Sequence, residues 1–286
     1  MTRASLTYLA IGLGVAIVLA EAYAAVQSRS QTMLEARHPL PPSAVHAATS
    51  PEAIAEGGHL VQVAACSVCH GRSLAGMMIA AAGSPVYAPN LTLVVRKRTD
   101  AEFDRAIRKG LRPDGTSELG MPAHVYARFT DAETAAILGY LRSLKPQGTL
   151  QTRPSPGIVQ RLDLAAGIMH TAVQRLATAH MPLDLGPRFE TGRHLASVSC
   201  AQCHGPDLSG GHGAPGPDLM VRGDYDRPQF HALMRQGEAR SGHDLELMSG
   251  TARSSFSHFS DAEIDAIYDY LNARDLRLAG PPPPSR

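Results

Sequence analysis

Two short motifs decide how this chain folds: Cys66-Ser-Val-Cys69-His70 in the first half and Cys200-Ala-Gln-Cys203-His204 in the second. Together they use all four cysteines of the 286-residue chain. Four cysteines are too few for a disulfide scaffold in a chain of this length, so their spacing indicates their role. In both motifs the two thiols stand three positions apart and a histidine follows at once.

This spacing is typical of covalent attachment of a c-type haem, with the histidine as the proximal iron ligand. A zinc ribbon needs its cysteine pairs about 15 to 20 residues apart, whereas 130 residues separate Cys69 from Cys200. A thioredoxin-like dithiol needs a βαβ context that the sequence lacks. We therefore predict two covalently bound haem c groups, with His70 and His204 as ligands to the iron.

The motifs belong to a longer internal repeat. Around them, residue pairs recur at an offset of 134: Glu56 with Glu190, Gly58 with Gly192, Leu74 with Leu208, and Gly76 with Gly210. Later pairs keep the same order at offsets of 127 and 130: Phe103 with Phe230, Gly110 with Gly237, Asp131 with Asp261, Glu133 with Glu263, and Tyr140 with Tyr270. Self-similarity of this kind indicates a tandem duplication. The sequence therefore predicts two homologous domains, over 50–146 and 186–280.

Each half is predicted to consist of short helices. Ser50 before Pro51 marks the start of one helix. Capping boxes are predicted at four further starts: Thr99 with Glu102, Thr130 with Glu133, Asp226 with Gln229, and Ser260 with Glu263. Strand-like alternation is absent, and the Gly- and Pro-rich stretches 82–89 and 210–217 are predicted as loops. The expected fold class is all-α.

Residues 1–28 form a predicted transmembrane anchor or signal. No charged residue occurs from Ala4 to Ala20, and apart from Glu21 the run continues to Val26. About 20 apolar residues span the hydrocarbon core of a bilayer as a helix. Arg3 before the run and the small residues at 22–24 also fit a cleaved secretory signal. The run is longer than an ordinary signal core, which favours a retained anchor.

The remaining segments are linkers. Residues 29–49 precede the first domain, 147–185 join the two domains, and 281–286 form a Pro-rich tail. Between the domains, apolar residues at helical spacing from Ile158 to Leu176 predict one amphipathic helix. We expect this helix to brace the two domains; a helix on the membrane surface and a loosely ordered connector are the alternatives. Arg161, Asp163 and Arg175 argue against a second membrane span.

A sixth iron ligand is expected in each half. Met121 lies 51 positions after His70, between Gly120 and Pro122, and has no neighbours at helical spacing. Met248 occupies the corresponding place, 44 positions after His204. The rival ligands are His124 in the first half, and His243 and His258 in the second. Met234 shares a predicted helix with apolar residues and is expected in the core, while Met77 and Met78 follow the first motif too closely.

The sequence resembles tandem class I cytochrome c domains. The matching residues are the two motifs, Pro89-Asn-Leu and Pro217-Asp-Leu, Met121-Pro, and the closing segments from Phe129 and Phe259. The resemblance covers both repeats and not the segment between them. It is nearest to membrane-anchored dihaem cytochrome c subunits of periplasmic alcohol, aldehyde or sugar-acid dehydrogenases.

The resemblance implies an all-helical fold around each haem and haem attachment outside the cytoplasm. It also implies His–Met ligation, by His70 with Met121 and by His204 with Met248. The second methionine is the looser match, because Met248 precedes Ser249 rather than proline. The expected location is the inner membrane, with one span and the haem domains in the periplasm. If the first segment is cleaved, the protein would be soluble in the periplasm.

His–Met ligation leaves no open iron site for a substrate and raises the reduction potential. The predicted role is therefore electron transfer rather than catalysis. Single electrons would pass through two haems from a periplasmic dehydrogenase or membrane partner toward the respiratory chain. A dihaem peroxidase-like enzyme is one alternative, with an open haem beside His243, Glu246 or His258. The dihaem subunit of a terminal oxidase and a redox sensor are others.

Composition limits the partners and the core. The formal net charge of +1 argues against a nucleic-acid partner, because proteins that bind nucleic acid carry an excess of basic residues. Residues 50–146 hold 11 Lys plus Arg and 9 Asp plus Glu, whereas 186–280 hold 9 and 13. One hypothesis is that the two domains face different redox partners; the alternative is that these charges only form a solvated surface. Aromatic residues make up 5% of the chain and Trp is absent. A haem at the centre of each core would replace these large side chains, and neither domain is expected to fold stably without it.

Overall fold

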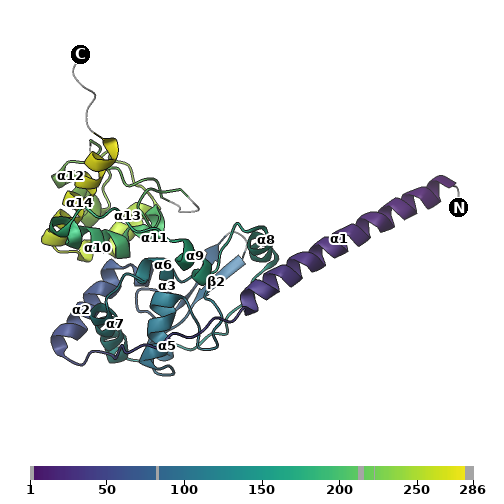
Figure 1. The fold of residues 1–286 in the computed structure, drawn as a ribbon, viewed down its shortest axis with the longest axis horizontal. Coiled ribbons are helices and arrows are strands. Elements are labelled where there is room, and N and C mark those ends of the chain that lie inside the picture. Colours follow the sequence, from purple (N-terminus) through teal and green to yellow (C-terminus); the bar gives the residue numbers. More distant parts are fainter. Residues whose placement is uncertain (1–2, 82–83, 212–215, 222, 281–286) are drawn as a thin grey trace, which may run out of the picture.

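The structure is a computed structural model that describes residues 3–81, 84–211, 216–221 and 223–280. Helix α1 (Arg3–Glu35) projects from the rest of the molecule as one long rod (Figure 1). An 18-residue window of this helix has a mean hydropathy of 2.1, and none of the window is buried. By length and composition α1 could therefore span a membrane. The predicted Pro-rich tail at 281–286 lies outside the described residues.

The first domain is built from short helices around the first cysteine motif. Its elements are α2 (Pro51–Val63), α3 (Cys66–His70), β1 (Met77–Ala81), β2 (Ser84–Ala88), α4 (Leu91–Val94), α5 (Asp100–Asp104), η1 (Arg105–Lys109), α6 (Ala123–Tyr126) and α7 (Asp131–Ser143). The strands form an antiparallel hairpin in which Met78 pairs with Tyr87. The prediction that 82–89 is only a loop is therefore wrong: β1 is apolar at every position, so no alternation of apolar and polar residues marks the hairpin in the sequence.

The second domain repeats this order of helices. Its elements are η2 (Pro187–Phe189), α10 (Glu190–Ser199), α11 (Ala201–His204), α12 (Arg227–Gln236), α13 (Leu247–Ser254), η3 (Phe256–His258) and α14 (Asp261–Ala279). All four predicted capping boxes are confirmed, with both reciprocal hydrogen bonds present in each. Ser50 also caps α2 as predicted. Apart from the hairpin, the prediction of an all-α fold is confirmed.

In each domain the first helix crosses the last helix at a glycine. A Cβ atom on Gly57 would lie 1.9 Å from the carbonyl oxygen of Ala136, and one on Gly192 would lie 1.9 Å from that of Ala266. These two contacts identify Gly57 as the counterpart of Gly192. The predicted pairing of Gly58 with Gly192 is therefore wrong by one residue.

The shift has a local cause between the first helix and the motif. In the first domain, Ala65 separates α2 from α3 and adopts the left-handed conformation, with φ 57°. In the second domain, α10 passes into α11 through Cys200, which keeps a helical conformation. Ala65 is thus one extra residue. The offset between the repeats is 135 before it and 134 after it.

The segment between the domains contains two helices, α8 (Ile158–Ala166) and α9 (Ala172–Thr178), so the prediction of one helix is wrong. Gly167 ends α8 in the left-handed region, with φ 73°, and Thr171 starts α9 with a capping box. The apolar spacing continues across this break, and periodicity alone did not reveal it. Helix α8 packs against α1 and β2, and α9 packs against α6 and η1.

The two domains are joined by a reciprocal pair of His–Glu contacts. His59 Nε2 lies 2.8 Å from Glu263 Oε1, and His194 Nε2 lies 2.7 Å from Glu133 Oε1. The other carboxylate oxygen of each glutamate accepts a hydrogen bond from the backbone N–H of the residue that caps its own helix, Thr130 for Glu133 and Ser260 for Glu263. Each glutamate therefore caps a helix in one domain and holds a histidine from the other. Arg128 adds hydrogen bonds to backbone carbonyls of the second domain.

These contacts shift the pKa values of His59, Glu133 and Glu263. The hydrogen bond to Glu263 raises the pKa of His59 above its ordinary value of 6.5. Burial acts to raise the pKa of Glu263, but hydrogen bonds from His59 and Ser260 lower it overall, below 4.5. The pKa of Glu133 is lowered in the same way by His194 and Thr130 against the effect of burial. The charged His59–Glu263 pair is thus favoured at mildly acidic pH.

We predict that replacing both His59 and His194 with glutamine weakens domain pairing in a pH-dependent way. A raised histidine pKa stabilises the folded state below pH 6.5, and this contribution is lost as pH rises through the raised value. A lowered glutamate pKa stabilises it above pH 4.5, and this contribution is lost as pH falls. Urea unfolding followed by circular dichroism should therefore show a loss of about 1–2 kcal/mol near pH 5.5, and less near pH 8.5.

The matched control is His231→Gln, because His231 pairs with Asp265 within the second domain. Limited proteolysis of the linker should become faster in the double variant and not in the control. The same pH dependence of unfolding in the wild type and the double variant would contradict this role for the pairs.

Candidate functional site

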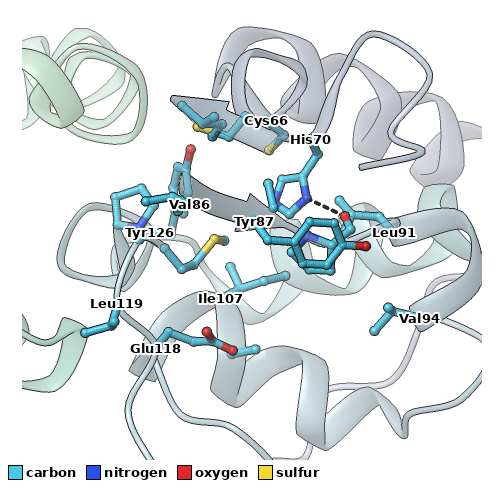
Figure 2. Close-up of a pocket in the computed structure, with 18 of the residues that line it drawn as sticks. Cys66, His70, Val86, Tyr87, Leu91, Val94, Ile107, Glu118, Leu119 and Tyr126 are labelled. Carbon is cyan, nitrogen blue, oxygen red and sulfur yellow. Dashed lines mark hydrogen bonds between the residues drawn. The ribbon is translucent and has the colours of Figure 1, made fainter. Parts of the chain in front are cut away.

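The first cysteine motif lies at the wall of a cavity in the first domain. Cys66, Cys69 and His70 from α3 line it, and Met121 lines it from the loop before α6. Figure 2 shows His70 and Tyr126 directed toward the same space. Most of the other walls are apolar side chains: Val61, Val94, Phe103, Ile107, Ile137 and Leu141. The structure therefore brings the four predicted residues of this half to one cavity.

Each motif histidine is held in one tautomer. His70 Nδ1 lies 2.8 Å from the carbonyl oxygen of Pro89 (Figure 2), and His204 Nδ1 lies 2.7 Å from that of Pro217. A carbonyl oxygen only accepts, so Nδ1 is the protonated nitrogen and Nε2 keeps its lone pair. Burial lowers the pKa of both histidines, which favours the neutral ring. A neutral imidazole with a free Nε2 is the form that binds iron.

The backbone after the two motifs follows the same path. Gly76 N–H donates to His70 O over 2.9 Å, and Gly210 N–H donates to His204 O over 2.7 Å. Both glycines have a left-handed φ, of 82° and 66°. A Cβ atom would lie 2.7 Å from Asn90 N at Gly76 and 2.5 Å from Asp218 N at Gly210. The two glycines match in the repeat because at both positions the backbone approaches another backbone segment too closely for a side chain to fit.

The four cysteines lie in or beside the core: Cys200 is buried, and Cys66, Cys69 and Cys203 are half-buried. Burial raises the pKa of Cys66 to about 12 and that of Cys200 to about 11. No disulfide joins any two of them. A redox dithiol needs a lowered thiol pKa, so these cysteines do not suit one. Within the described residues, no group of three or more His, Cys, Asp and Glu side chains is arranged to hold a metal ion.

The loop that contains Met121 is fixed by α9. Arg175 donates to the carbonyl oxygen of Leu119 over 2.6 Å and to that of Met121 over 3.2 Å. Ala172 N–H, at the start of α9, donates to Glu118 O over 2.8 Å. No sequence pattern singled out Arg175 for this role. The linker between the domains therefore helps to position Met121.

His124, the rival ligand, is not among the residues that line the cavity. Its Nδ1 atom is buried without a hydrogen-bond partner. Burial lowers its pKa to about 4, with Arg175 and Arg128 acting in the same direction. The structure thus places Met121, and not His124, at the cavity.

In the second domain the candidate ligands differ in burial. Met248 lies in the first turn of α13, is partly buried and packs against the hydrophobic core. His243, Glu246 and His258 are exposed. Met234 is buried in α12, with 1% of its surface exposed, which confirms its predicted place in the core. Of the predicted ligands in this region, Met248 is the one in contact with the core.

The two motifs face each other across the domain interface. Gln202, inside the second motif, lines the cavity of the first domain. The hydroxyl of Tyr126 donates to Ala64 O over 2.7 Å and lies 3.4 Å from Gln202 Oε1. Burial raises the pKa of Cys69, and the nearby Cys203 thiol raises it further. The sequence repeat did not predict that its two copies would meet at these residues.

These residues fit a covalently attached haem. The cavity offers two thiols, an imidazole with a free Nε2, a thioether and apolar walls for the macrocycle. Arg98 and Arg153 also line it and supply two positive charges for the haem propionates. In the second domain, Cys200, Cys203 and His204 have the same local backbone and the same histidine hydrogen bond.

Comparisons with known proteins match both domains. Residues 189–275 match the family described as Cytochrome c. Residues 52–141 match the family described as Cytochrome C oxidase, cbb3-type, subunit III.

Three curated relatives match most of the chain. The cytochrome c subunit of alcohol dehydrogenase (quinone) from Komagataeibacter europaeus is 24% identical over 82% of this chain and 57% of the relative. The cytochrome subunit of fructose dehydrogenase from Gluconobacter japonicus is 24% identical over 77% and 52%. The alcohol dehydrogenase (quinone) cytochrome c subunit from Gluconobacter oxydans is 23% identical over 80% and 56%. The chain spans about half the length of the curated relatives it matches.

The family matches and the geometry agree on the two cysteine motifs. Each matched range contains one motif, its histidine and its predicted methionine. Each half of the chain therefore contains one cytochrome c domain.

Proposed function

We propose that the protein transfers single electrons through two covalently bound c-type haems, from a dehydrogenase toward the respiratory chain. The observation that supports this most directly is the meeting of the two motifs, where Gln202 of the second lines the cavity of the first. The haem supplies one-electron redox chemistry. Cys66 and Cys69 would hold it by two thioether bonds, the apolar walls would exclude water from it, and the Pro89 carbonyl oxygen fixes the ring of His70.

We propose His70 with Met121, and His204 with Met248, as the two axial ligand pairs. Met121 is supported by its place at the cavity and Met248 by its contact with the core. With both axial positions filled, neither iron has a free site for a substrate. This is why we propose an electron-transfer subunit rather than a dihaem peroxidase-like enzyme.

A periplasmic dehydrogenase is the proposed electron donor. The relatives named above are cytochrome subunits of dehydrogenases for alcohol and fructose. We propose further that α1 is retained as a single-pass anchor in the inner membrane, with both haem domains in the periplasm. The opposite charge balance of the two domains would steer different redox partners to them.

The dihaem subunit of a terminal oxidase is a second candidate. One observation favours it: the first domain matches the family of subunit III of cbb3-type oxidases. The two candidates share the haem sites and differ in their partner.

The proposed ligands are tested by Met121→Ala and Met248→Ala in the full-length holoprotein. Optical and paramagnetic resonance spectra should show two low-spin His–Met haems in the wild type. Each variant should lose the methionine-to-iron charge-transfer band of one haem and lower its potential. His124→Ala and His243→Ala are the controls and should change neither band. A high-spin, peroxide-reactive haem in the wild type would instead support the peroxidase-like alternative.

The clamp on the Met121 loop gives a separate prediction. Arg175→Ala should remove two hydrogen bonds from the loop, with a cost of about 1–3 kcal/mol. We expect the charge-transfer band of the first haem to weaken on warming at a lower temperature than in the wild type. Arg175→Lys keeps a donor and should restore part of the band. Global unfolding without earlier loss of the band would indicate that Arg175 only stabilises the fold.

The donor is tested in membranes from cells that lack the gene and express the wild type or a Cys200→Ser/Cys203→Ser variant. With a dehydrogenase partner, ethanol or fructose should reduce the haems of the wild type. Loss of the second haem should slow substrate-dependent quinone reduction at least about tenfold if both haems lie in one path. Haem oxidation by oxygen that is blocked by cyanide, without reduction by either substrate, would favour the oxidase candidate.

A further inference from the structure

We propose that α8 lies in the headgroup layer of the membrane that α1 enters, and that its outward apolar face contacts lipid. This inference rests on the proposed retention of α1 as a membrane anchor. It assigns a lipid surface as the partner of a face that the haem sites and the domain interface leave exposed.

Helix α8 is fixed to α1 just beyond the apolar run. The Arg161 guanidinium donates to Ser30 Oγ over 3.1 Å and to Gln31 Oε1 over 3.0 Å. Ser30 is the buried residue of α1, with 0% of its surface exposed. Figure 1 shows α8 beside the base of α1, on the side of the first domain from which α1 projects. The contact therefore sets the height of α8 along the membrane normal.

That height matches the headgroup layer. The apolar run ends at Val26, four residues before Ser30, which is about 6 Å along a helix. The polar layer adds about 5–8 Å on each side of the hydrocarbon core, since the core is about 30 Å thick and the whole bilayer 40–45 Å. An α1 that spans the membrane therefore places α8 within this layer.

The two sides of α8 have opposite character. Gln160 and Leu164 are buried on the side that packs against α1 and β2, and Gln160 lines the cavity of the first domain. The outward side is apolar, and its exposed members are Ile158 (46%), Val159 (38%), Leu162 (46%), Ala166 and, just beyond the helix, Ile168 (74%). A compact apolar face is costly in water but suits an interfacial helix, which buries such a face at the boundary of headgroups and acyl chains.

Charge at the joint fits a lipid surface. The side-chain hydrogen-bond partners of Arg161 are a hydroxyl and an amide, so neither of them neutralises the guanidinium. Arg29 and Arg37 are exposed on the same part of the chain. Basic side chains at this depth attract anionic headgroups. A lipid surface therefore offers acyl chains to the apolar face and anionic headgroups to the basic side chains beside it.

The test uses full-length holoprotein in nanodiscs of phosphatidylcholine and phosphatidylglycerol, with a photoactivatable diazirine attached to a lipid acyl chain. Labelled peptides are identified by mass spectrometry. We expect label on α1 and on the peptide with Ile158 and Leu162. We expect none on the peptide with Leu276 and Leu278, which are more exposed than Ile158 and Leu162, at 49% and 59%, but lie in the second domain.

Leu162→Glu should lower labelling of α8 by about tenfold, as expected for the loss of one buried leucine contact. Labelling of α1 and the optical spectrum of the haems should not change. Leu276→Glu is the matched control and should leave all labelling unchanged. Because both leucines are exposed, neither substitution removes a core contact.

Two other outcomes would overturn the inference in distinguishable ways. Label on α1 without label on α8 would show that the face meets water or protein although the anchor is in place. Absence of label from α1 would show that the proposed anchor itself fails. Equal labelling of the α8 and Leu276 peptides would show that the probe follows apolar exposure and not membrane depth.

Discussion

At Gly57 and Gly192 the first and last helices of each domain approach so closely that a Cβ atom would lie 1.9 Å from a carbonyl oxygen. This close crossing fixes the direction of α2 and α10, and both helices lead directly into a cysteine motif. Two residues after each glycine stands the histidine that reaches the other domain, His59 or His194. One steric constraint therefore sets both the approach to the haem site and the pairing of the domains.

Sequence reasoning was most successful where the chemistry is local. The two cysteine motifs and the four capping boxes depend on residues within a few positions of each other. Contacts between distant segments were missed: Arg175 holds a loop about 55 residues away, and Gln202 reaches the cavity of the other domain. Gly167 was missed for a different reason, because apolar spacing continues through the turn that it makes. The one-residue insertion at Ala65 was also missed, because the residue pairs in and just after the cysteine motifs still align at a single offset.

The two copies have diverged beside the histidines of the two cysteine motifs. In the first domain, the buried Asn90 side chain donates to Gln147 O over 2.6 Å. In the second, Asp218 pairs with Arg274 over 2.9 Å, and Arg274 is 2% exposed beside the equally buried Asp275. The same loop is thus held by neutral hydrogen bonds in one copy and by charges in the other. Local net charge is one of the determinants of a haem potential, so the duplication created two electrostatically distinct sites.

The wall of the first cavity is assembled from three parts of the chain. Most of it belongs to the first domain, but Pro154, Pro156 and Gln160 come from the linker and Gln202 comes from the second domain. A fragment that ends at residue 146 would leave this cavity open on two sides. The first repeat therefore ends before the residues that complete its cavity. The duplicated unit is the unit of ancestry, whereas the smallest unit with an intact first site extends through the second cysteine motif.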